Sequence, residues 1–173
     1  MKWTAVALMC SIVHLASVNC QCDLGNKVDY DPKMVEGSRY LVYSSPDIFD
    51  ELSKIQIEFT LEEGAYFSIR NITFKNVTEA RVFNSSWKIN SDKDIDAVTP
   101  EIPKFNAVYR LLSKETRAIL IFKSCPAAYD ETPLIFVLTE EQCPKKETVE
   151  HALADVGLDI TNFSKDPAVD CRN

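Results

Sequence analysis

Apolar and polar residues alternate along much of the chain with a period of two, the spacing of a half-buried β-strand. One clear example is 55–61, where the apolar row is Ile55, Ile57, Phe59 and Leu61. A second is 104–112, where the row is Phe105, Ala107, Tyr109 and Leu111. A polar turn at 113–116 follows, and then 118–122 is apolar on both faces, as in a strand covered on both sides. The stretch 104–125 therefore predicts an antiparallel hairpin that ends at Cys125.

Further strands are expected at 40–43, 66–74, 79–88 and 134–139. The segment 22–36 is expected to be an irregular arm, and 91–102 holds at most one short strand. After Pro144 the period becomes helical, because the apolar residues Val149, Ala152, Leu153 and Val156 share one helix face. A helix is thus predicted over 144–156 with Gly157 as its cap, and 159–163 as a last short strand. Many short strands and one late helix indicate an all-β sandwich or closed barrel with the helix packed outside.

The N-terminus has the features of a secretory signal peptide, with Lys2 before a short apolar run at 3–16. Cleavage is expected after Cys20, with cleavage after Ser17 as the alternative. A membrane anchor is the less favoured interpretation, because spanning needs ~20 apolar residues and this run is shorter. The expected organisation is a signal peptide at 1–20 and one barrel domain at 21–173, secreted and without an integral membrane span.

Four cysteines remain after cleavage at that position: Cys22, Cys125, Cys143 and Cys171. In a secreted chain they predict two disulfides, for which three pairings exist. Four glycosylation sequons begin at Asn71, Asn76, Asn84 and Asn162. Three of them fall within fifteen residues, which suggests one sugar-covered face.

Composition argues against several functions. Removing Lys2 takes the formal charge from -7 to -8, and no basic run is present, so nucleic acid and anionic membranes are poor partners. Only His151 remains after cleavage, which leaves no His/Cys metal cluster and no Ser-His or Cys-His dyad. The carboxylate pairs Glu62-Glu63 and Glu140-Glu141 are expected to be solvated turns. No enzymatic activity and no cofactor are expected.

Four pieces, in order, resemble the lipocalin family, specifically its apolipoprotein D and bilin-binding branch. Gly37-Ser38-Arg39-Tyr40 stands where that branch has Gly-x-Trp-Tyr, and 109–113 with 119–125 resembles its Y-x-V-L-x-T-D-Y … V-Y-S-C hairpin. Residues 134–138 before Pro144 resemble its eighth strand, and 144–160 its helix and following strand. The resemblance implies an eight-stranded antiparallel up-and-down barrel with one C-terminal α-helix outside.

Two departures fall at one end of that barrel. Arg39 replaces the family's Trp, and Glu140 replaces the Arg that packs over it, so the usual cation–π pair is missing. An Arg39–Glu140 ion pair is expected to take its place, worth ~0–1 kcal/mol if it is exposed. The family's acidic turn reads Lys114-Glu115-Thr116, so this chain would be a divergent member.

The resemblance also implies the disulfide pairing. In that branch the N-terminal cysteine pairs with the one ending the seventh strand, which implies Cys22–Cys125 here. The family's second bridge starts in the second strand, where this chain has no cysteine, so Cys171 is expected to pair with Cys143 instead.

Lipocalins use the inner row of the barrel to hold apolar small molecules, and the resemblance therefore implies a ligand-binding interior. The residues expected to line it are Ile55, Ile57, Phe59, Phe105, Ala107, Tyr109, Leu111, Leu120, Phe122 and Phe136, with Tyr109 as the polar handle. The expected function is a secreted carrier or scavenger of a lipid, sterol, retinoid or pigment, with any receptor or lipoprotein partner left open. The alternative is a secreted protein-binding module whose loops 46–54 and 91–103 contact the partner. A third, weaker idea is a scavenger of haem or a biogenic amine.

Overall fold

The computed structural model describes residues 23–61, 66–74, 80–83, 85–113, 117–125, 133–169 and 171. The expected signal peptide, Cys22 and the sequon residues Asn76 and Asn84 lie outside these ranges. The described strands are β1 (Gly37–Ser45), β2 (Leu52–Ser53), β3 (Gln56–Thr60), β4 (Tyr66–Phe74), β5 (Arg81–Phe83), β6 (Ser86–Ile89), β7 (Ile95–Val98), β8 (Ala107–Leu111), β9 (Ile119–Cys125), β10 (Ile135–Thr139) and β11 (Ser164–Lys165). The described helices are α2 (Lys146–Asp155) and the 3-10 turns η1 (Pro32–Met34), η2 (Pro103–Phe105) and η3 (Ile160–Asn162).

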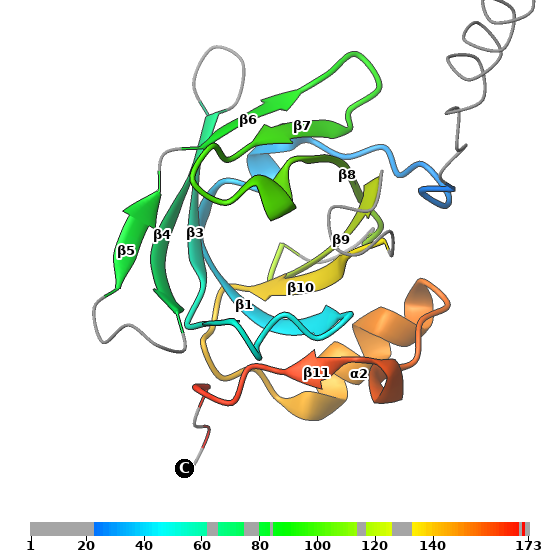
Figure 1. Cartoon of the computed structure of the whole chain (residues 1–173). Helices are drawn as coiled ribbons and strands as arrows, with labels where there is room; N and C mark the ends of the chain where they lie inside the picture. The colour runs from blue at the N-terminus through cyan, green and yellow to red at the C-terminus, as the bar shows by residue number, and fades with distance from the viewer. Residues whose placement is uncertain are drawn as a thin grey trace, which may run out of the picture.

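All described strand pairs are antiparallel, and they form one curled sheet in the order β2-β4-β3-β1-β10-β9-β8-β7-β6. The strand expected at 79–88 is divided in two: β5 pairs with β4, and β6 pairs with β7. Counting this divided strand once, the wall contains the eight expected strands around one interior (Figure 1). The all-β barrel with one helix outside is therefore confirmed.

The wall buries apolar side chains on both faces where α2 covers it. Strand β9 shows this directly, because Leu120 and Phe122 belong to the interior cluster while Ile119 and Ile121 belong to an outer cluster. In the outer cluster they are joined by Val149 and Leu153 of α2, both fully buried. In Figure 1, α2 lies outside the wall formed by β1 and β10. The doubly apolar pattern of 118–122 is explained by this arrangement.

Helix α2 ends as the sequence predicts. Gly157 has φ +75° and its N–H donates to Ala154 O at 2.9 Å, while the N–H of Leu158 donates to Leu153 O at 2.9 Å. These two bonds form a Schellman cap, which requires a left-handed residue and so favours glycine. His151 is exposed on the outer side of the helix, as expected.

Two local predictions are wrong. Residues 159–163 do not form a strand, because Asp159 caps a 3-10 turn instead, its carboxylate accepting from Thr161 N at 2.9 Å. The last strand, β11, comes one residue later and pairs with β1.

The second disulfide is also not as expected. The structure contains no bond between Cys143 and Cys171, and both side chains are exposed. The thiol of Cys171 lies 3.7 Å from Val169 O, and Lys165 Nζ lies 3.5 Å from the same sulfur. The tail turns after Asp166, whose backbone carbonyl accepts from Val169 N at 3.1 Å, and this turn directs Cys171 to these local contacts. Cys125 is disulfide-bonded, and the Cys22 expected as its partner lies outside the described residues.

Candidate functional site: the barrel interior

The interior of the barrel is lined by one continuous cluster of buried apolar side chains. All ten residues expected to line it belong to this cluster, and each is at most 8% exposed: Ile55, Ile57, Phe59, Phe105, Ala107, Tyr109, Leu111, Leu120, Phe122 and Phe136. Alternation along β3, β8, β9 and β10 therefore identified the correct face of each strand. Two of the ten do not come from a strand: Phe105 lies in η2, and Ile55 directly precedes β3.

Aromatic rings occupy the centre of this cluster. Trp87 and Tyr109 are stacked with ring centroids 5.2 Å apart and ring planes 13° apart. Phe59 meets Trp87 edge-on at 6.2 Å, and Phe136 meets Tyr109 edge-on at 5.3 Å. Phe122 then contacts Phe136 at 5.4 Å. Five rings from five strands thus form a connected aromatic surface inside the wall, with geometries that aromatic pairs prefer.

The sequence interpretation missed Trp87, which is 2% exposed and central to this surface. A signal was present, because Trp87 and Ile89 alternate with Ser86 and Lys88 along β6. The sequence also gave no inward assignment to Leu41, Ile95, Ala97, Leu134 and Leu138, which belong to the same cluster.

An internal hydrogen bond limits the expected role of Tyr109 as a polar handle to that of an acceptor. Its hydroxyl donates to the backbone carbonyl of Phe105 at 3.0 Å, so its hydrogen is already engaged within the chain. Burial raises the pKa of Tyr109 well above its ordinary value, and the phenol is neutral at physiological pH. The hydroxyl can still accept a hydrogen bond from a ligand.

One end of the barrel, where β1 begins and β10 ends, is closed by polar contacts. Arg39 is 2% exposed and its guanidinium Nη1 lies 3.0 Å from Glu140 Oε1, which confirms the expected pair. The same guanidinium donates to the backbone carbonyls of Ser38, Met34 and Glu36 at 3.2–3.3 Å. Burial lowers the pKa of Arg39, and the neighbouring Glu140 opposes this. Because Arg39 is buried and Glu140 is 43% exposed, the contribution of a fully exposed pair is a lower limit for this one.

A second ion pair lies at the same end. Arg110 donates twice to the carboxylate of Asp94, at 2.8 and 2.7 Å, and also to Gly25 O at 3.0 Å. The Tyr30 hydroxyl donates to Lys93 O at 2.8 Å, and burial raises the pKa of Tyr30 to about 12. These bonds fasten the N-terminal arm across this end of the barrel.

The other end, where β1 ends, is covered by the loop 46–53, which includes β2. Its apolar side chains are buried in the interior cluster: Ile48 is 0% exposed, Leu52 is 2% and Phe49 is 6%. Ile102 and Phe105, on the connection between β7 and β8, belong to the same cluster. Side chains of the loop 46–53 and of the β7–β8 connection, outside the barrel wall, therefore cover this end.

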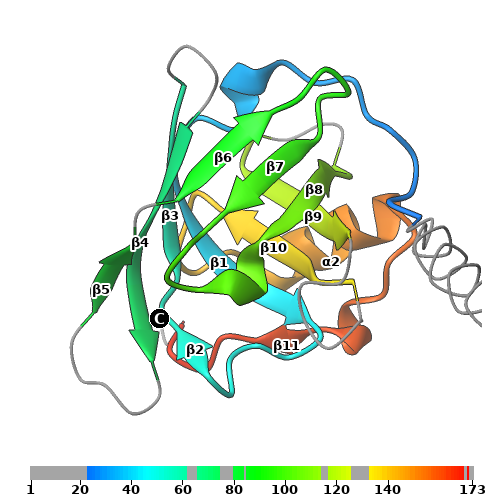
Figure 2. The same cartoon turned by 45° about the horizontal axis from the view of Figure 1, so that its top comes forward.

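A buried carboxylate fixes the end of that loop. Asp166 is 0% exposed, and its side chain accepts from Lys54 N at 2.8 Å and from Ala168 N at 2.9 Å. Lys54 has φ +51°, the left-handed region that non-glycine residues seldom adopt. The C-terminal segment after β11 is thus bound to the residue at which the loop ends, and β2 lies beside β11 (Figure 2).

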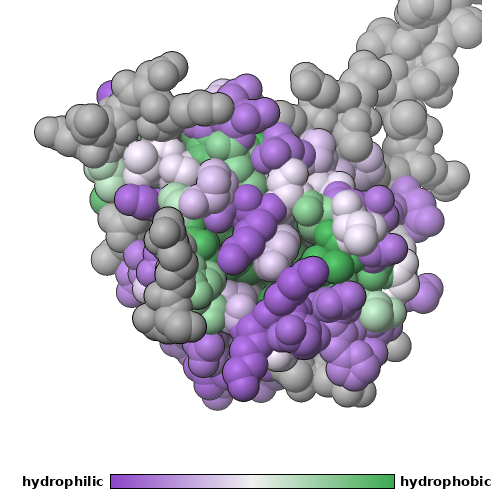
Figure 3. Space-filling view, turned by 90° about the horizontal axis from the view of Figure 1, so that it is seen from below, coloured by the Kyte–Doolittle hydropathy of each residue, from purple (hydrophilic) through white to green (hydrophobic). Residues whose placement is uncertain are grey.

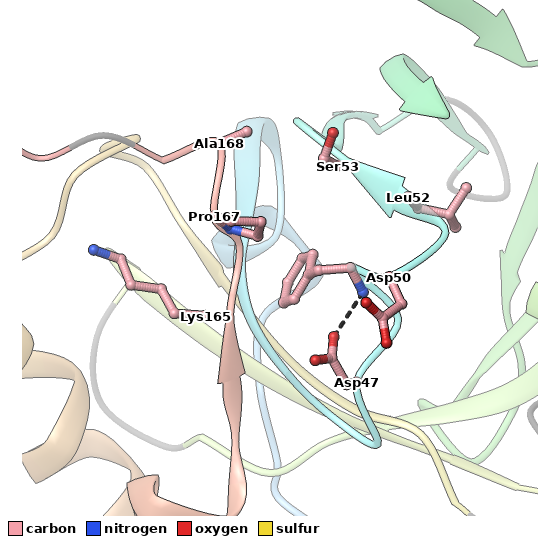
Figure 4. A pocket seen from close by; sticks show the side chains of 8 residues that line it. Asp47, Asp50, Leu52, Ser53, Lys165, Pro167 and Ala168 are labelled. Atoms are coloured by element: carbon pink, nitrogen blue, oxygen red, sulfur yellow. Dashed lines mark hydrogen bonds between the residues drawn. The ribbon is translucent and has the colours of Figure 1, made fainter. Parts of the chain in front are cut away.

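Between this loop and the C-terminal segment lies an open pocket of about 520 Å³ (Figure 4). Phe49 and Leu52 contribute to its wall, and Asp47, Asp50 and Lys165 supply charges. Asp47 accepts from Phe49 N at 2.8 Å. The pocket is on the outer side of the loop, so it borders the interior without being part of it.

Polar side chains dominate the face seen in Figure 3, with apolar ones visible in the gaps. Within the described ranges, no group of three or more His, Cys, Asp or Glu side chains could hold a metal ion. No helix in the part of the chain that the structure covers is long and apolar enough to cross a membrane.

Neither a family model nor a curated protein matches this sequence. Solved structures do match. The cockroach allergen Per a 4 has a TM-score of 0.64 at 14% identity, covering 84% of this chain and 93% of the allergen. Insecticyanin from the tobacco hornworm Manduca sexta has a TM-score of 0.63 at 13% identity, covering 84% of each chain. A structure named odorant-binding protein OBP1 has a TM-score of 0.56 at 15% identity, covering 84% of this chain and 99% of the other.

The chain has the lipocalin fold. At these identities the likeness shows the fold alone. The Arg39–Glu140 contact occupies the place of the missing Trp–Arg pair, and the loop 46–53 covers the opposite end.

Proposed function

We propose that this protein is a secreted carrier or scavenger of a small hydrophobic molecule held inside the barrel. The observation that carries the proposal is the continuous apolar and aromatic lining of the interior, which is covered at one end by the loop 46–53. Moving such a loop would expose the lining at the expense of only the two-residue pairing of β2 with β4. Burying a ligand's apolar surface there would drive binding at ~25 cal/mol per Å².

The likeness to a structure named an odorant-binding protein supports this type of role. Catalysis plays no part in the proposal. A closer relation to apolipoprotein D and the bilin-binding proteins rests on the sequence pieces and remains a prediction.

Secretion is part of the proposal. It includes removal of residues 1–20, a Cys22–Cys125 disulfide, and sugar on one or more of the four sequons. Two observations support it: Cys125 is disulfide-bonded, and Asn162 is exposed in η3. Asn71 lies in β4, and its side chain is outside the described parts.

A lipid-extraction and titration experiment tests the carrier function. Trp87 is the only tryptophan beyond residue 20, and it lies in the interior, so its fluorescence reports on the proposed site. The secreted protein would be extracted with organic solvent for mass spectrometry and then titrated with fatty acids, sterols and retinoids. We expect a co-purified molecule or a saturable change in Trp87 emission. The carrier proposal fails if neither is found.

The second candidate is a protein-binding module, and one observation favours it. The interior residues Tyr109, Leu120 and Phe122 are each 0% exposed, as in a filled core. The loops 46–54 and 91–103 would then contact the partner. A negative titration together with loss of partner binding on replacing exposed loop residues such as Asp50 and Glu101 would favour this candidate.

A further inference from the structure

We propose that the C-terminal segment 164–169 controls how readily the loop 46–53 opens, and that it acts through the buried carboxylate of Asp166. This control rests on the proposed function, because a loop that opens is useful only to an interior that takes a ligand. The segment contributes no side chain to the interior cluster. The control would therefore come from a part of the chain that lies outside the barrel.

The loop ends at Lys54, in a backbone conformation that the segment stabilises. Lys54 has φ +51°, in the left-handed region that residues with a Cβ adopt only at a cost. Its N–H donates to Asp166 Oδ2 at 2.8 Å. A hydrogen bond to a carboxylate is stronger than one between neutral groups. Asp166 thus offsets the cost of the left-handed conformation and fixes the direction in which the chain leaves the loop.

The carboxylate of Asp166 is itself held in place. The side chain is 0% exposed, and its other oxygen, Oδ1, accepts from Ala168 N at 2.9 Å. The backbone N–H of Asp166 donates to Val42 O of β1 at 3.0 Å. A buried carboxylate needs donors, because a buried charge without partners is strongly disfavoured. Moving the end of the loop away would remove the donor that Lys54 N supplies, so the bond resists opening at this point.

The segment is anchored on the outer side of the barrel. Strand β11 pairs with β1. Val169 is 6% exposed and belongs to the outer cluster, together with Val149 and Leu153 of α2. The apolar side chains of the loop belong to the interior cluster instead. The bond between Asp166 and Lys54 therefore joins a segment that packs with the helix to a loop that covers the interior.

An open pocket lies between the loop and the segment beside this bond. Its volume is about 520 Å³, and its lining includes Asp50 and Leu52 of the loop and Lys165 and Pro167 of the segment (Figure 4). Packed side chains therefore do not fill the space between the two along this stretch. We expect a shift of the segment to reach the loop chiefly through Asp166.

Amide hydrogen exchange on the secreted protein tests this control without a ligand, because local exchange reports the population of locally opened forms. Asp166→Ala should speed exchange in 46–54 by at least about 10-fold, since it removes a hydrogen bond to a charged group. Asp166→Asn should have a smaller effect, because the amide oxygen can still accept one of the two bonds. Asp159→Ala is the matched control, since the Asp159 carboxylate also accepts from a backbone N–H but is exposed in another turn. It should leave 46–54 unchanged.

A variant of Val169 tests whether the segment, and not only its carboxylate, has this influence. Val169→Ala removes apolar contacts from the outer cluster and keeps Asp166. It should speed exchange in 46–54 by about 3-fold, because a looser segment holds the carboxylate less firmly. Circular dichroism would confirm that each variant is folded.

Labelling of a buried thiol tests whether loosening the loop opens the interior. Ala107 is 8% exposed, belongs to the interior cluster and follows η2, which lies at the same end of the barrel as the loop. In Ala107→Cys, the reaction of the new thiol with iodoacetamide would be followed by peptide mass spectrometry. Its rate follows the population of the open form when opening and closing are fast. Adding Asp166→Ala should raise this rate by at least about 10-fold, and adding Asp159→Ala should not change it.

Four results would overturn the proposal. Unchanged exchange in 46–54 for Asp166→Ala would show that the carboxylate does not hold the loop, and no effect of Val169→Ala would exclude control by the segment. Equal acceleration in β8 and β9 would indicate a loss of overall stability. Unchanged labelling at position 107 despite faster loop exchange would show that the loop does not gate the interior. The carrier function is tested separately by extraction and titration, so its failure can be distinguished from each of these.

Discussion

Replacing Glu140 with glutamine tests whether the buried Arg39 depends on a negative partner. The substitution keeps the shape and one oxygen, and it removes the charge that lies 3.0 Å from Arg39 Nη1. Arg39 would retain its three backbone carbonyl acceptors, but its positive charge would be buried without compensation.

The size of the effect lies between two limits. Exposed ion pairs contribute about 0–1 kcal/mol, and removing one partner of a fully buried pair costs about 3–5 kcal/mol. Arg39 is 2% exposed at its side chain, but Glu140 is 43% exposed, so solvent screens one side of the pair. We therefore expect Glu140→Gln to lower the free energy of unfolding by about 1–2 kcal/mol.

Chemical denaturation of the variant and two controls would measure this loss. Glu141→Gln makes the same charge change at an exposed neighbour, and Arg117→Gln removes the weaker contact at 3.6 Å from Glu140. Both controls should stay within about 0.5 kcal/mol of the unsubstituted protein. The loss should largely persist at high salt, because ions screen a buried guanidinium poorly. If Glu140→Gln costs no more than Glu141→Gln, the buried-charge argument is wrong.

Three further predictions concern the interior, the arm and the helix. Phe122→Asp should abolish ligand binding while Lys123→Ala, outward on the same strand, retains it; equal losses in a fluorescence titration would contradict the inward assignment of Phe122. The raised pKa of Tyr30, about 12, means that its contribution is complete below about pH 10 and is lost as the pH rises through 12. Denaturation curves across that range should therefore show about 2 kcal/mol more alkaline loss in the unsubstituted protein than in Tyr30→Phe, and parallel curves would refute the assignment. Gly157→Ala should cost about 1 kcal/mol in thermal unfolding through backbone strain alone, since φ is +75° and no atom lies within 4 Å of the added Cβ; a neutral result would contradict the cap.

The sequence predicted the elements whose pattern has one physical cause. In β3 and β8 the alternation reflects burial on one face, and in β9 the unbroken apolar run reflects burial under α2 on the other. The helix was predictable because the apolar residues of its buried face have helical spacing, and because Gly157 marks the position at which that spacing ends. Arg39 and Glu140 could be paired because both depart from the lipocalin pattern at one place.

Other features have no periodic signature. The division of the expected strand 79–88 into β5 and β6 depends on which neighbour each half pairs with, and nothing in the local pattern specifies that. In the sequence, Asp159 is a polar residue between the apolar Leu158 and Ile160. Only the structure shows that its carboxylate caps η3. The contacts of Cys171 with Lys165 and Val169 likewise depend on the path of the tail after Asp166.

The loop 46–53 decides how the interior can serve a carrier. Strand residues such as Tyr109 and Phe122 cannot leave the interior without unpairing the wall, so they cannot make room for a ligand. Ile48 and Leu52 lie outside that wall, in a loop where Ile48 N donates to Ser44 Oγ at a long 3.4 Å and β2 has a two-residue pairing with β4. At its far end the loop is held at Lys54 by the buried carboxylate of Asp166. We expect a carrier with this interior to open by lifting 46–53 about that fixed point, and the volume released would be that of the loop side chains Ile48, Phe49 and Leu52.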